Sequence, residues 1–440
     1  MEIYFKEISS YIISKKEVGE EVTVTMAGEK THFVRFNKSK IRQGSDIHQL
    51  NLSMAIQKYG KEYSYDFTIT GISTKDHSKV DDMYKICRSR METMAKAAFF
   101  VPFKNNGTLS VSNTGDLSEI TELTNILCNE TAHIDLAGIL TSGICYRGNV
   151  NSLGQSHWFE SESFSVDYSI YSEKEKAVKG FYGGAEFDVN SFKAILEESI
   201  KNLHHMEKEN KVLDPGKYRC YLAPAAVSEI LSTFCWGGTS QGALKQGSSP
   251  LLPYKNEGKR LSKKFNLNED FSLGLTGRFN DEGEVFTEKL PIFKNGQLEN
   301  LLVSSRTAKE YGLKSNAANS NESLRSPVIE SGELSREDIL KELTTGLYIS
   351  NLHYLNWSDQ KRGRITGMTR FACFWVENGE IVAPIKDLRF DDTLYNFWGD
   401  NLEQVTDFSD IELQSSTYSL RSLGGSKCPG MIIKDFNFTL

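Results

Sequence analysis

The chain has 440 residues, of which 39% are hydrophobic and 25% are charged, and its formal net charge is −7. This length favours two domains over a single hydrophobic core, and the composition is that of a folded globular protein. The acidic balance argues against a large phosphate-neutralising surface, so we expect no nucleic-acid partner.

The sequence carries no recognisable targeting or membrane segment. No stretch approaches the roughly 20 apolar residues that a membrane span needs. Residues 1–7 lack the basic start and long apolar run of a signal peptide, so we expect a cytoplasmic protein without membrane contact. The 7 cysteines are widely spread without a C-x-x-C pair, which favours reduced thiols over a disulfide framework or a zinc knuckle.

The first half of the chain alternates predicted strands and helices. β-branched and aromatic residues favour strands at 22–36 and 64–72. A spacing of three and four residues predicts an amphipathic helix over 80–99, with the apolar positions Val80, Met83, Tyr84, Cys87, Met91, Met94, Ala95 and Ala98. A second helix is predicted from Ser191 to about Lys208.

A polar segment ending in Pro215-Gly216 is typical of a linker. We therefore expect an N-terminal α/β domain over 1–208, a linker over 209–216, and a β-rich C-terminal domain with a central helix over 217–440. The fold class is α+β. In the second domain we predict a strand over 218–222 and a helix over 225–236 that ends at Gly237-Gly238.

The remainder of the second domain is expected to be rich in strands. Asn295-Gly296 and Asn378-Gly379 lie between apolar runs and predict two hairpins. The polar segment 312–335 is long for a loop inside a compact domain, so it is either functional or mobile.

Three segments together resemble a known family. They are residues 31–43 (Thr-His-Phe-Val-Arg-Phe-Asn-Lys-Ser-Lys-Ile-Arg-Gln), residues 304–312 (Ser-Ser-Arg-Thr-Ala-Lys-Glu-Tyr-Gly) and residues 374–381 (Phe-Trp-Val-Glu-Asn-Gly-Glu-Ile). With weaker matches at 213–218, 246–249, 346–349 and 428–435, their order resembles the TldD/PmbA (TldE) family of zinc metallopeptidase-related proteins over nearly the whole chain.

The resemblance implies where the chemistry of the family lies. Its zinc-binding TldD-type members carry His-Glu-x-x-x-His on a helix near the middle of the chain and a late cysteine. Here the comparable stretch, 229–236, contains neither histidine. The chain therefore resembles the PmbA/TldE type, and the resemblance implies a TldD-like partner subunit that holds the zinc, with no catalytic residue and no metal ligand in this chain.

The residues themselves also argue against a zinc site. A catalytic zinc needs about three nitrogen, sulfur or carboxylate ligands. The central helix offers Glu229, Ser232 and Cys235, and the first and last of these lie six positions apart. His204 and His205 are adjacent on the preceding helix and point in different directions, and Cys428 lies within the closing Pro-Gly segment.

Two other motif matches are better explained as turns. Residues 238–242 fit G-x-S-x-G around Ser240, but that motif needs a strand before the serine, and here a predicted helix precedes it. A stand-alone hydrolase using Ser240 is therefore our last-ranked hypothesis. Residues 423–427 lack the glycine spacing of a phosphate-binding loop.

Peptide capture needs no special side chains, because a sheet edge in a cleft binds an extended peptide through backbone hydrogen bonds. If a cleft is present beside the central helix, we expect Ser232, Cys235, Trp236 and Ser240 to line it. The alternative is that the helix end packs as core, with Phe234 and Trp236 buried.

The leading hypothesis is a non-catalytic PmbA/TldE-like subunit that pairs with a TldD-like zinc peptidase subunit and helps admit unfolded peptide substrate. Alone, the chain is expected to be able to form the equivalent homodimer. The second hypothesis is a peptide- or protein-binding modulator that acts without a protease, in keeping with the gyrase-modulator label of the family.

Overall fold

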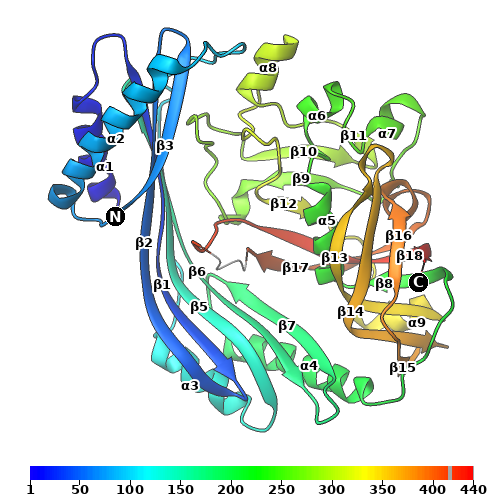
Figure 1. Cartoon of the computed structure of the whole chain (residues 1–440). Coiled ribbons are helices and arrows are strands. Elements are labelled where there is room, and N and C mark those ends of the chain that lie inside the picture. Colours follow the sequence, from blue (N-terminus) through cyan, green and yellow to red (C-terminus); the bar gives the residue numbers. More distant parts are fainter. Residues whose placement is uncertain (415–418, 440) are drawn as a thin grey trace.

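The computed structural model describes residues 1–414 and 419–439 as a mixed α and β protein built on two large sheets (Figure 1). The first sheet has the order β3-β2-β1-β5-β6-β4, with β7 paired to β6. Its strands are β1 (Glu21–Asn37), β2 (Lys40–Lys58), β3 (Lys61–Ile69), β4 (Thr108–Asn113), β5 (Asp135–Asn151), β6 (Ser156–Tyr171) and β7 (Ala177–Gly184).

The two faces of this first sheet differ in polarity. Along β1, the alternate residues from Val22 to Met26 and from Val34 to Phe36 are buried in apolar clusters. Helices cover this face at both ends: α1 (Glu2–Ser14) and α2 (Ser73–Thr93) at one, α3 (Ile120–Glu130) and α4 (Val189–Met206) at the other. Because side chains alternate along a strand, Thr25, Glu29 and Thr31 point the opposite way, toward the second half of the chain.

The second sheet has the order β11-β10-β9-β12-β18-β16-β14-β13-β8, with β15 on β14 and β17 on β18. An additional pairing of β18 with β8 closes the path β18-β16-β14-β13-β8 into a ring. The strands are β8 (Gly216–Leu222), β9 (Leu267–Asp270), β10 (Lys289–Lys294), β11 (Gln297–Leu298), β12 (Pro327–Ile329), β13 (Gly346–Asp359), β14 (Arg364–Glu377), β15 (Glu380–Pro384), β16 (Arg389–Thr393), β17 (Leu402–Leu413) and β18 (Gly425–Phe438).

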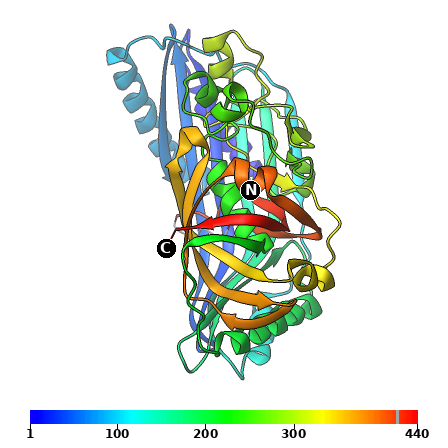
Figure 2. The ribbon, with the colours of Figure 1, turned by 90° about the vertical axis from the view of Figure 1, so that its right-hand side faces the viewer.

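The helix α5 (Pro224–Phe234) packs against this second sheet. Four short helices surround the sheet: α6 (Gln241–Lys245), α7 (Leu252–Asn256), α8 (Ser305–Tyr311) and α9 (Ile339–Leu343). In the turned view of Figure 2, this second half lies in front of the first sheet, so the two parts form two stacked layers.

Buried polar contacts join the two layers. Arg421 enters the polar face of the first sheet: its backbone N–H donates to Glu29 Oε1 at 3.0 Å, and its guanidinium donates to Gly143 O at 2.7 Å and to Ser163 O at 3.2 Å. The turn at 280–284 docks beside it, where Arg147 pairs with Asp281 at 2.6 Å. These polar contacts, together with the stacking of His157 on Phe279 at 5.3 Å, join the two layers.

The predicted division at residues 208 and 217 stays a prediction. The first sheet uses residues 21–184, and the second begins at Gly216. However, one apolar cluster contains Phe192 and Leu196 of α4 together with Ala372 and Phe374 of β14, so the core is continuous across the expected linker.

Most predicted elements are confirmed with shifted ends. The predicted strands at 22–36, 64–72 and 218–222 correspond to β1, β3 and β8, and the second predicted helix corresponds to α4. Both Asn-Gly pairs form hairpin turns with φ positive at both residues: φ is 50° and 70° at Asn295-Gly296, and 52° and 78° at Asn378-Gly379.

The helix predicted over 80–99 is wrong at both ends, because α2 covers Ser73–Thr93. Met94 has the extended values φ −79° and ψ 147°, so Ala95 and Ala98 lie beyond the helix. The backbone N–H of Ala97 donates to Gly60 O at 3.0 Å instead. The alanine-rich sequence favours a longer helix, but this hydrogen bond to a distant part of the chain holds residues beyond Thr93 in a non-helical conformation.

A buried carboxylate organises the polar segment 312–335. Glu322, 2% exposed, accepts hydrogen bonds from Ser240 Oγ at 2.6 Å, Gly242 N at 2.8 Å and Ser304 N at 2.7 Å. These donors lie at the start of α6 and just before α8, so Glu322 connects three stretches of chain.

No helix in the described part of the chain is long and apolar enough to cross a membrane.

We predict that Glu322→Ala lowers the free energy of unfolding by roughly 3 kcal/mol, because three buried donors lose their acceptor. Chemical denaturation followed by fluorescence measures the change. Glu333→Ala, an exposed glutamate of the same segment, is the matched control and should change stability by no more than about 0.5 kcal/mol. Equal effects of the two substitutions would contradict this role of Glu322.

Candidate functional site

The central helix α5 is mostly buried and exposes a narrow polar face. Pro224 stands at its first turn, where the missing N–H has no helical partner to lose. The face formed by Ala226, Val227, Ile230, Leu231 and Phe234 is buried in the core of the second sheet. Spacing of three and four residues leaves Glu229, Ser232 and Trp236 exposed on the other side.

The end of α5 is fixed by a sharp turn. The last helical residue is Phe234, and Gly237 has φ +87°. A Cβ at Gly238 would lie 2.2 Å from Phe234 O, so only glycine fits there. Trp236 O accepts hydrogen bonds from Trp357 Nε1 and Gln360 Nε2, both at 3.1 Å. The turn therefore holds Trp236, whose side chain is 56% exposed, at the mouth of a cleft.

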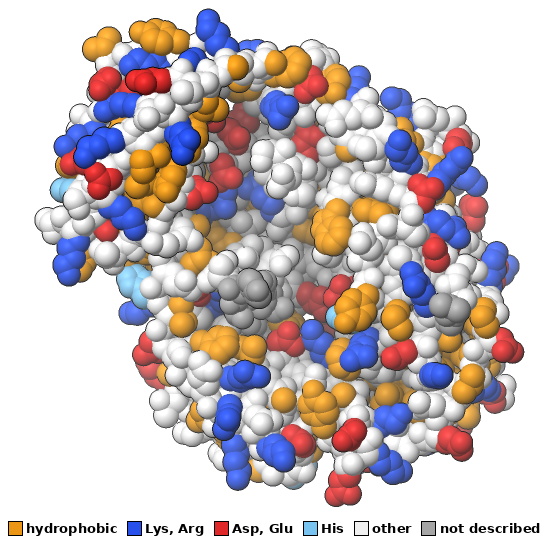
Figure 3. All heavy atoms as spheres, viewed as in Figure 1, with side chains coloured by type: hydrophobic (Ala, Val, Ile, Leu, Met, Phe, Trp, Pro, Cys, Tyr) orange, Lys and Arg blue, Asp and Glu red, His pale blue; other side chains and the backbone are white. Residues whose placement is uncertain are grey.

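The cleft beside α5 has a volume of about 460 Å³. It lies where α5 meets the ends of β17 and β18 near the centre of Figure 1, and Figure 3 shows carboxylates within the hollow between the two layers. Its lining residues are Ser228, Glu229, Leu231, Ser232, Cys235, Trp236, Ser323, Leu324, Arg325, Pro327, Glu412, Leu413, Gln414, Gly425 and Ser426.

Carboxyl groups set the electrostatics of this cleft. Burial raises the pKa of Glu412 to about 7, with a hydrogen bond from Ser228 opposing the shift and Glu229 adding to it. Burial also raises the pKa of Glu229, and it raises that of Asp410, a residue of β17 that does not line the cleft. None of these three carboxylates forms an ion pair within the described residues. With a pKa of about 7, the Glu412 carboxyl group is partly protonated near neutral pH.

The cation of the cleft is already engaged. The Arg325 guanidinium donates to Phe279 O at 2.8 Å and to Gly277 O at 3.1 Å, and it stacks on the Phe271 ring at 4.7 Å. Burial lowers its pKa to about 10. Its backbone N–H donates to Glu269, whose pKa burial raises to about 7. Arg325 thus holds the wall of the cleft, and within the described residues it forms no ion pair with the carboxyl groups of α5 and β17.

The structure brings three of the four predicted cleft residues together. Ser232, Cys235 and Trp236 line the cleft, and Phe234 is buried beneath them, 1% exposed. Their contact with a peptide stays a prediction. Ser240 is placed elsewhere: it is 7% exposed and lies away from the lining, so the expectation that it lines this cleft is corrected.

Ser240 serves as a helix cap. Its Oγ accepts a hydrogen bond from Ala243 N at 2.9 Å at the start of α6 and donates to Glu322. A serine in this position satisfies an otherwise free backbone N–H of the helix. The sequence 238–242 therefore fits G-x-S-x-G without the strand, exposed hydroxyl or neighbouring histidine of a nucleophile.

Comparisons with known proteins identify the family. The sequence model described as the PmbA/TldA metallopeptidase C-terminal domain matches residues 215–440. The chain belongs to the PmbA/TldD family. It is also 38% identical over 214 residues to metalloprotease PmbA from Escherichia coli O157:H7, a match that spans 46% of this chain and 45% of that relative.

Solved structures show the same fold over the whole length. TldE from Thermococcus kodakarensis aligns with a TM-score of 0.77 at 15% identity, over 99% of this chain and 100% of that one. A candidate modulator of a DNA gyrase from Thermotoga maritima MSB8 aligns with a TM-score of 0.76 at 16% identity, with the same coverage. The mixed α and β fold is thus that of the PmbA/TldD family.

The residues of this family member do not fit the zinc motif of its TldD-type relatives. If Glu229 takes the place of the motif glutamate, Ser228 and Thr233 stand where the two histidines would be. Ser228 Oγ lies 2.8 Å from Ser426 Oγ, and Thr233 Oγ1 donates to Glu229 O at 3.1 Å. Neutral hydroxyls that are engaged in this way are poor zinc ligands.

The remaining candidate ligands do not complete a site. Burial raises the pKa of Cys235 to about 12, and it raises the pKa of Cys428 as well, so both remain neutral thiols at physiological pH. His205 lies against the Phe374 ring, away from the cleft. Within residues 1–414 and 419–439, no three His, Cys, Asp or Glu side chains converge on a point that could hold a metal.

The sequence reasoning missed Glu412, Ser426 and Arg325. Glu412 and Ser426 pair across the β17–β18 ladder, and Arg325 comes from the polar segment before β12. None of them belongs to a motif, and each reaches α5 through pairings between residues far apart in the chain. The one available signal was the closing segment around Cys428, whose strand starts at Gly425.

The raised pKa of Glu412 predicts how stability depends on pH. Between the ordinary value of 4.5 and about 7, the folded state holds a proton that the unfolded chain releases, so unfolding becomes easier as pH rises. We expect Glu412→Gln to gain stability relative to the wild type on going from about pH 5 to about pH 8. Denaturation midpoints at both pH values measure this.

Glu380→Gln, at an exposed position of β15, is the matched control for that pH dependence. Its stability relative to the wild type should be the same at both pH values. A Glu412→Gln curve parallel to that of the wild type would show that Glu412 is ionised in the folded state with an ordinary pKa.

Proposed function

We propose that this chain is a non-catalytic subunit of a peptidase assembly, and that it binds extended peptide in the cleft beside α5. The observation that carries the proposal is the cleft of about 460 Å³ formed at the helix where TldD-type relatives hold zinc. With Glu229 aligned to the motif glutamate, Ser228 and Thr233 stand at the positions of the two histidines. In this proposal the cleft binds peptide, although the described residues contain no cluster that could hold a metal.

The shape and the polarity of the cleft suit a peptide. Its volume falls within the range of about 300–1,000 Å³ that is usual for ligand sites. Its walls come from strand ends at 412–414 and 425–426 and from the irregular stretch 323–325, so backbone groups as well as side chains border it. An extended peptide binds such walls through its own backbone and is selected for being unfolded.

Charge suits a peptide with an exposed cation. Glu229 and Glu412 line the cleft, and neither forms an ion pair within the described residues. The ammonium or guanidinium group of a bound peptide could form an ion pair with them and so favour their charged form. We infer that lysine- or arginine-bearing unfolded segments bind better than acidic ones, and that binding weakens at low pH as the two carboxyl groups take up protons.

In this proposal the peptide bond is cleaved by a TldD-like partner subunit. That partner holds the zinc, which supplies the activated water for peptide hydrolysis when bound. The relative PmbA from Escherichia coli O157:H7 is named a metalloprotease, and the likeness in fold to TldE supports a role beside such chemistry. The residues of this chain bind and orient the peptide. We place the assembly in the cytoplasm.

The first experiment compares the purified chain alone with the chain mixed with a TldD-like partner. We expect no bound zinc and no peptide hydrolysis from the chain alone, and chelator-sensitive hydrolysis in the mixture. Stoichiometric zinc and activity in the isolated chain would overturn the proposal. Peptide binding that persists while the mixture stays inactive would favour a modulator that acts without a protease.

A cleft-filling substitution tests the binding site itself. Ser232→Trp places an indole in the cleft and should weaken binding of a fluorescent unfolded peptide by about tenfold or more, which corresponds to losing roughly 1.4 kcal/mol. Ser78→Trp, on the exposed side of α2, is the matched control and should bind like the wild type. Equal affinities for both variants would move the peptide site elsewhere.

A further inference from the structure

The hairpin of β13 and β14 is irregular where it passes the end of α5. Tyr354 and Leu355 of β13 together lie opposite the single residue Gly367 of β14, because the ladder shifts register between His353 and Asn356. Two residues opposite one form a β-bulge, and a bulge turns side chains in directions that a regular strand cannot give.

The bulge places two neighbouring rings on the outer face of the sheet. In a regular strand, His353 and Tyr354 would point to opposite faces, because side chains alternate. Instead both side chains are exposed, and their ring centroids lie 4.0 Å apart. Leu355 packs against the core of the second sheet, where the alternation would have put Tyr354. The Tyr354 side chain is left 76% exposed.

The backbone of Tyr354 is strained. Its φ is 55°, a left-handed value that is unfavourable for a residue with a bulky side chain. A bulge whose first residue is left-handed normally has glycine there. Tyr59 has nearly the same φ, 53°, but it forms the two-residue turn between β2 and β3 with Gly60, and such turns require positive φ. No hairpin turn requires it of Tyr354, and strain without a structural reason points to function.

The bulge lies at the rim of the cleft beside α5. Trp357, on the same strand, donates from Nε1 to Trp236 O at 3.1 Å at the mouth of the cleft. Burial raises the pKa of the Glu229 carboxyl group, and the nearby charges of Lys179 and His353 oppose that rise. Figure 3 shows hydrophobic side chains along the rim of the hollow between the two layers. The rim therefore carries aromatic rings from β13 as well as from the end of α5.

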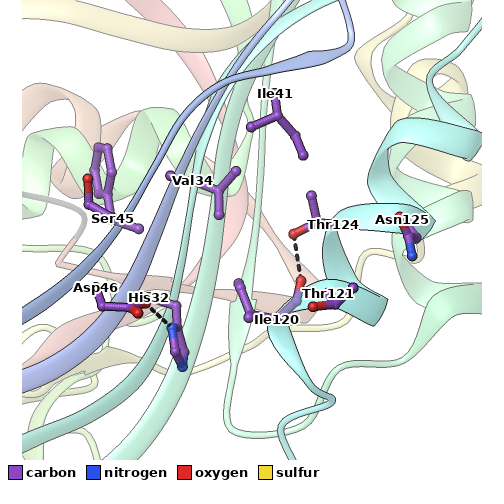
Figure 4. Close-up of a pocket in the computed structure, with 11 residues that line it drawn as sticks. His32, Val34, Ile41, Ser45, Asp46, Ile120, Thr121, Thr124 and Asn125 are labelled. Atoms are coloured by element: carbon purple, nitrogen blue, oxygen red, sulfur yellow. Dashed lines mark hydrogen bonds and ion pairs between the residues drawn. The ribbon is translucent and has the colours of Figure 1, made fainter.

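Backbone strain is not a general property of grooves on this chain. The groove between β2 and α3 has a volume of about 370 Å³, and Val34, Ile41 and Ile120 form its apolar walls (Figure 4). His32 Nδ1 lies 2.5 Å from Asp46 Oδ1 at one end. None of the described residues that line this groove has a positive φ. The strained and exposed ring of the bulge is thus a feature of the cleft rim.

We propose that the β13 bulge is a specificity element, in which the ring of Tyr354 stacks on an aromatic side chain of the unfolded peptide that occupies the cleft beside α5. This inference rests on the proposed function, because it places the peptide in that cleft. Aromatic rings pack in offset or edge-to-face arrangements, and Tyr354 has one face on His353 and the other free. Trp236, 56% exposed, adds a second aromatic surface at the same mouth.

The cationic and the aromatic side chain of such a peptide have different places. Glu229 and Glu412 lie within the cleft and suit a lysine or arginine. His353 becomes positively charged on protonation, so a cation on the neighbouring Tyr354 ring would lie beside a like charge. A neutral aromatic side chain meets no such repulsion. The preferred peptide is therefore unfolded and carries an aromatic residue in addition to its basic one.

Peptide preference tests the proposal. Two fluorescent, lysine-containing peptides of equal length and net charge differ only in having phenylalanine or alanine at one position, and this position is varied along the peptide. We expect the wild type to bind the best phenylalanine peptide about fivefold more tightly, or more, than its alanine counterpart. Tyr354→Gly should bind both peptides as the wild type binds the alanine peptide, while Tyr354→Phe should keep the preference.

Stability separates this binding role from a structural one. Glycine adopts a φ of 55° without strain, so Tyr354→Gly should be at least as stable as the wild type in chemical denaturation although it loses the preference. Tyr59→Gly, matched in φ and with an exposure of 75%, is the control and should keep the full preference. A less stable Tyr354→Gly that binds both peptides more weakly would overturn the proposal, because the ring would then serve to hold the bulge.

The outcomes for this inference and for the proposed function are distinguishable. Equal affinities of the wild type for the phenylalanine and alanine peptides at every position would overturn this inference alone. Failure of both kinds of peptide to bind would overturn the proposed function and this inference with it. A preference that Tyr59→Gly loses as Tyr354→Gly does would place its origin away from the cleft rim and would also overturn the inference.

Discussion

The burial of β18 is the constraint on which the second half of the molecule depends. This strand pairs with β8, β12, β16 and β17, and its residues Cys428, Met431, Ile433 and Phe436 are completely buried. Its pairing with β8 closes the ring of strands, and α5 packs on the surface so formed. Because β17 and β18 end beside α5, the strand that completes the core also places Glu412 and Ser426 in the cleft. Core and site therefore share one set of backbone hydrogen bonds.

The second constraint is the polar face of the first sheet. Helices cover one face, and the face that meets the second layer carries Glu29, Thr31 and other polar residues. Arg421 satisfies this face with five hydrogen bonds from its backbone and guanidinium, at an exposure of 8%. The main effect of a buried arginine with this many hydrogen bonds is to fix the relative orientation of the two layers, and its net contribution to stability is smaller. Arg421 lies four residues before β18, so its anchoring also helps to place the start of β18, which forms one wall of the cleft.

The sequence could predict local structure well and the site only in part. Local sequence located β1 through its β-branched and aromatic content, α4 through its periodicity and α5 through the Gly-Gly pair that follows it. The Asn-Gly pairs located two hairpins because that pair favours two positive φ angles. The end of α2 failed because Ala97 finds Gly60, a partner 37 residues away. Ser232, Cys235 and Trp236 were found since they lie on α5 and on the turn that ends it. Glu412 and Arg325 were not, since only the closed second sheet brings them to α5.

The helix α5 shows how a cleft can be present beside a helix that offers no zinc motif. Histidines of a zinc motif lie on the stripe of a helix that faces its ligand, and the buried stripe does the packing. Here Thr233 returns its hydroxyl to the helix backbone and Ser228 joins Ser426, so both replacements are satisfied without closing the cleft. If the end of α5 packed entirely as core, Trp236 would be buried and Glu412 would have a charged partner. Instead Trp236 is half exposed and the pKa of Glu412 is raised to about 7 by burial, which destabilises the folded state at neutral pH. A carboxyl group with a perturbed pKa in a concave site marks a candidate functional site.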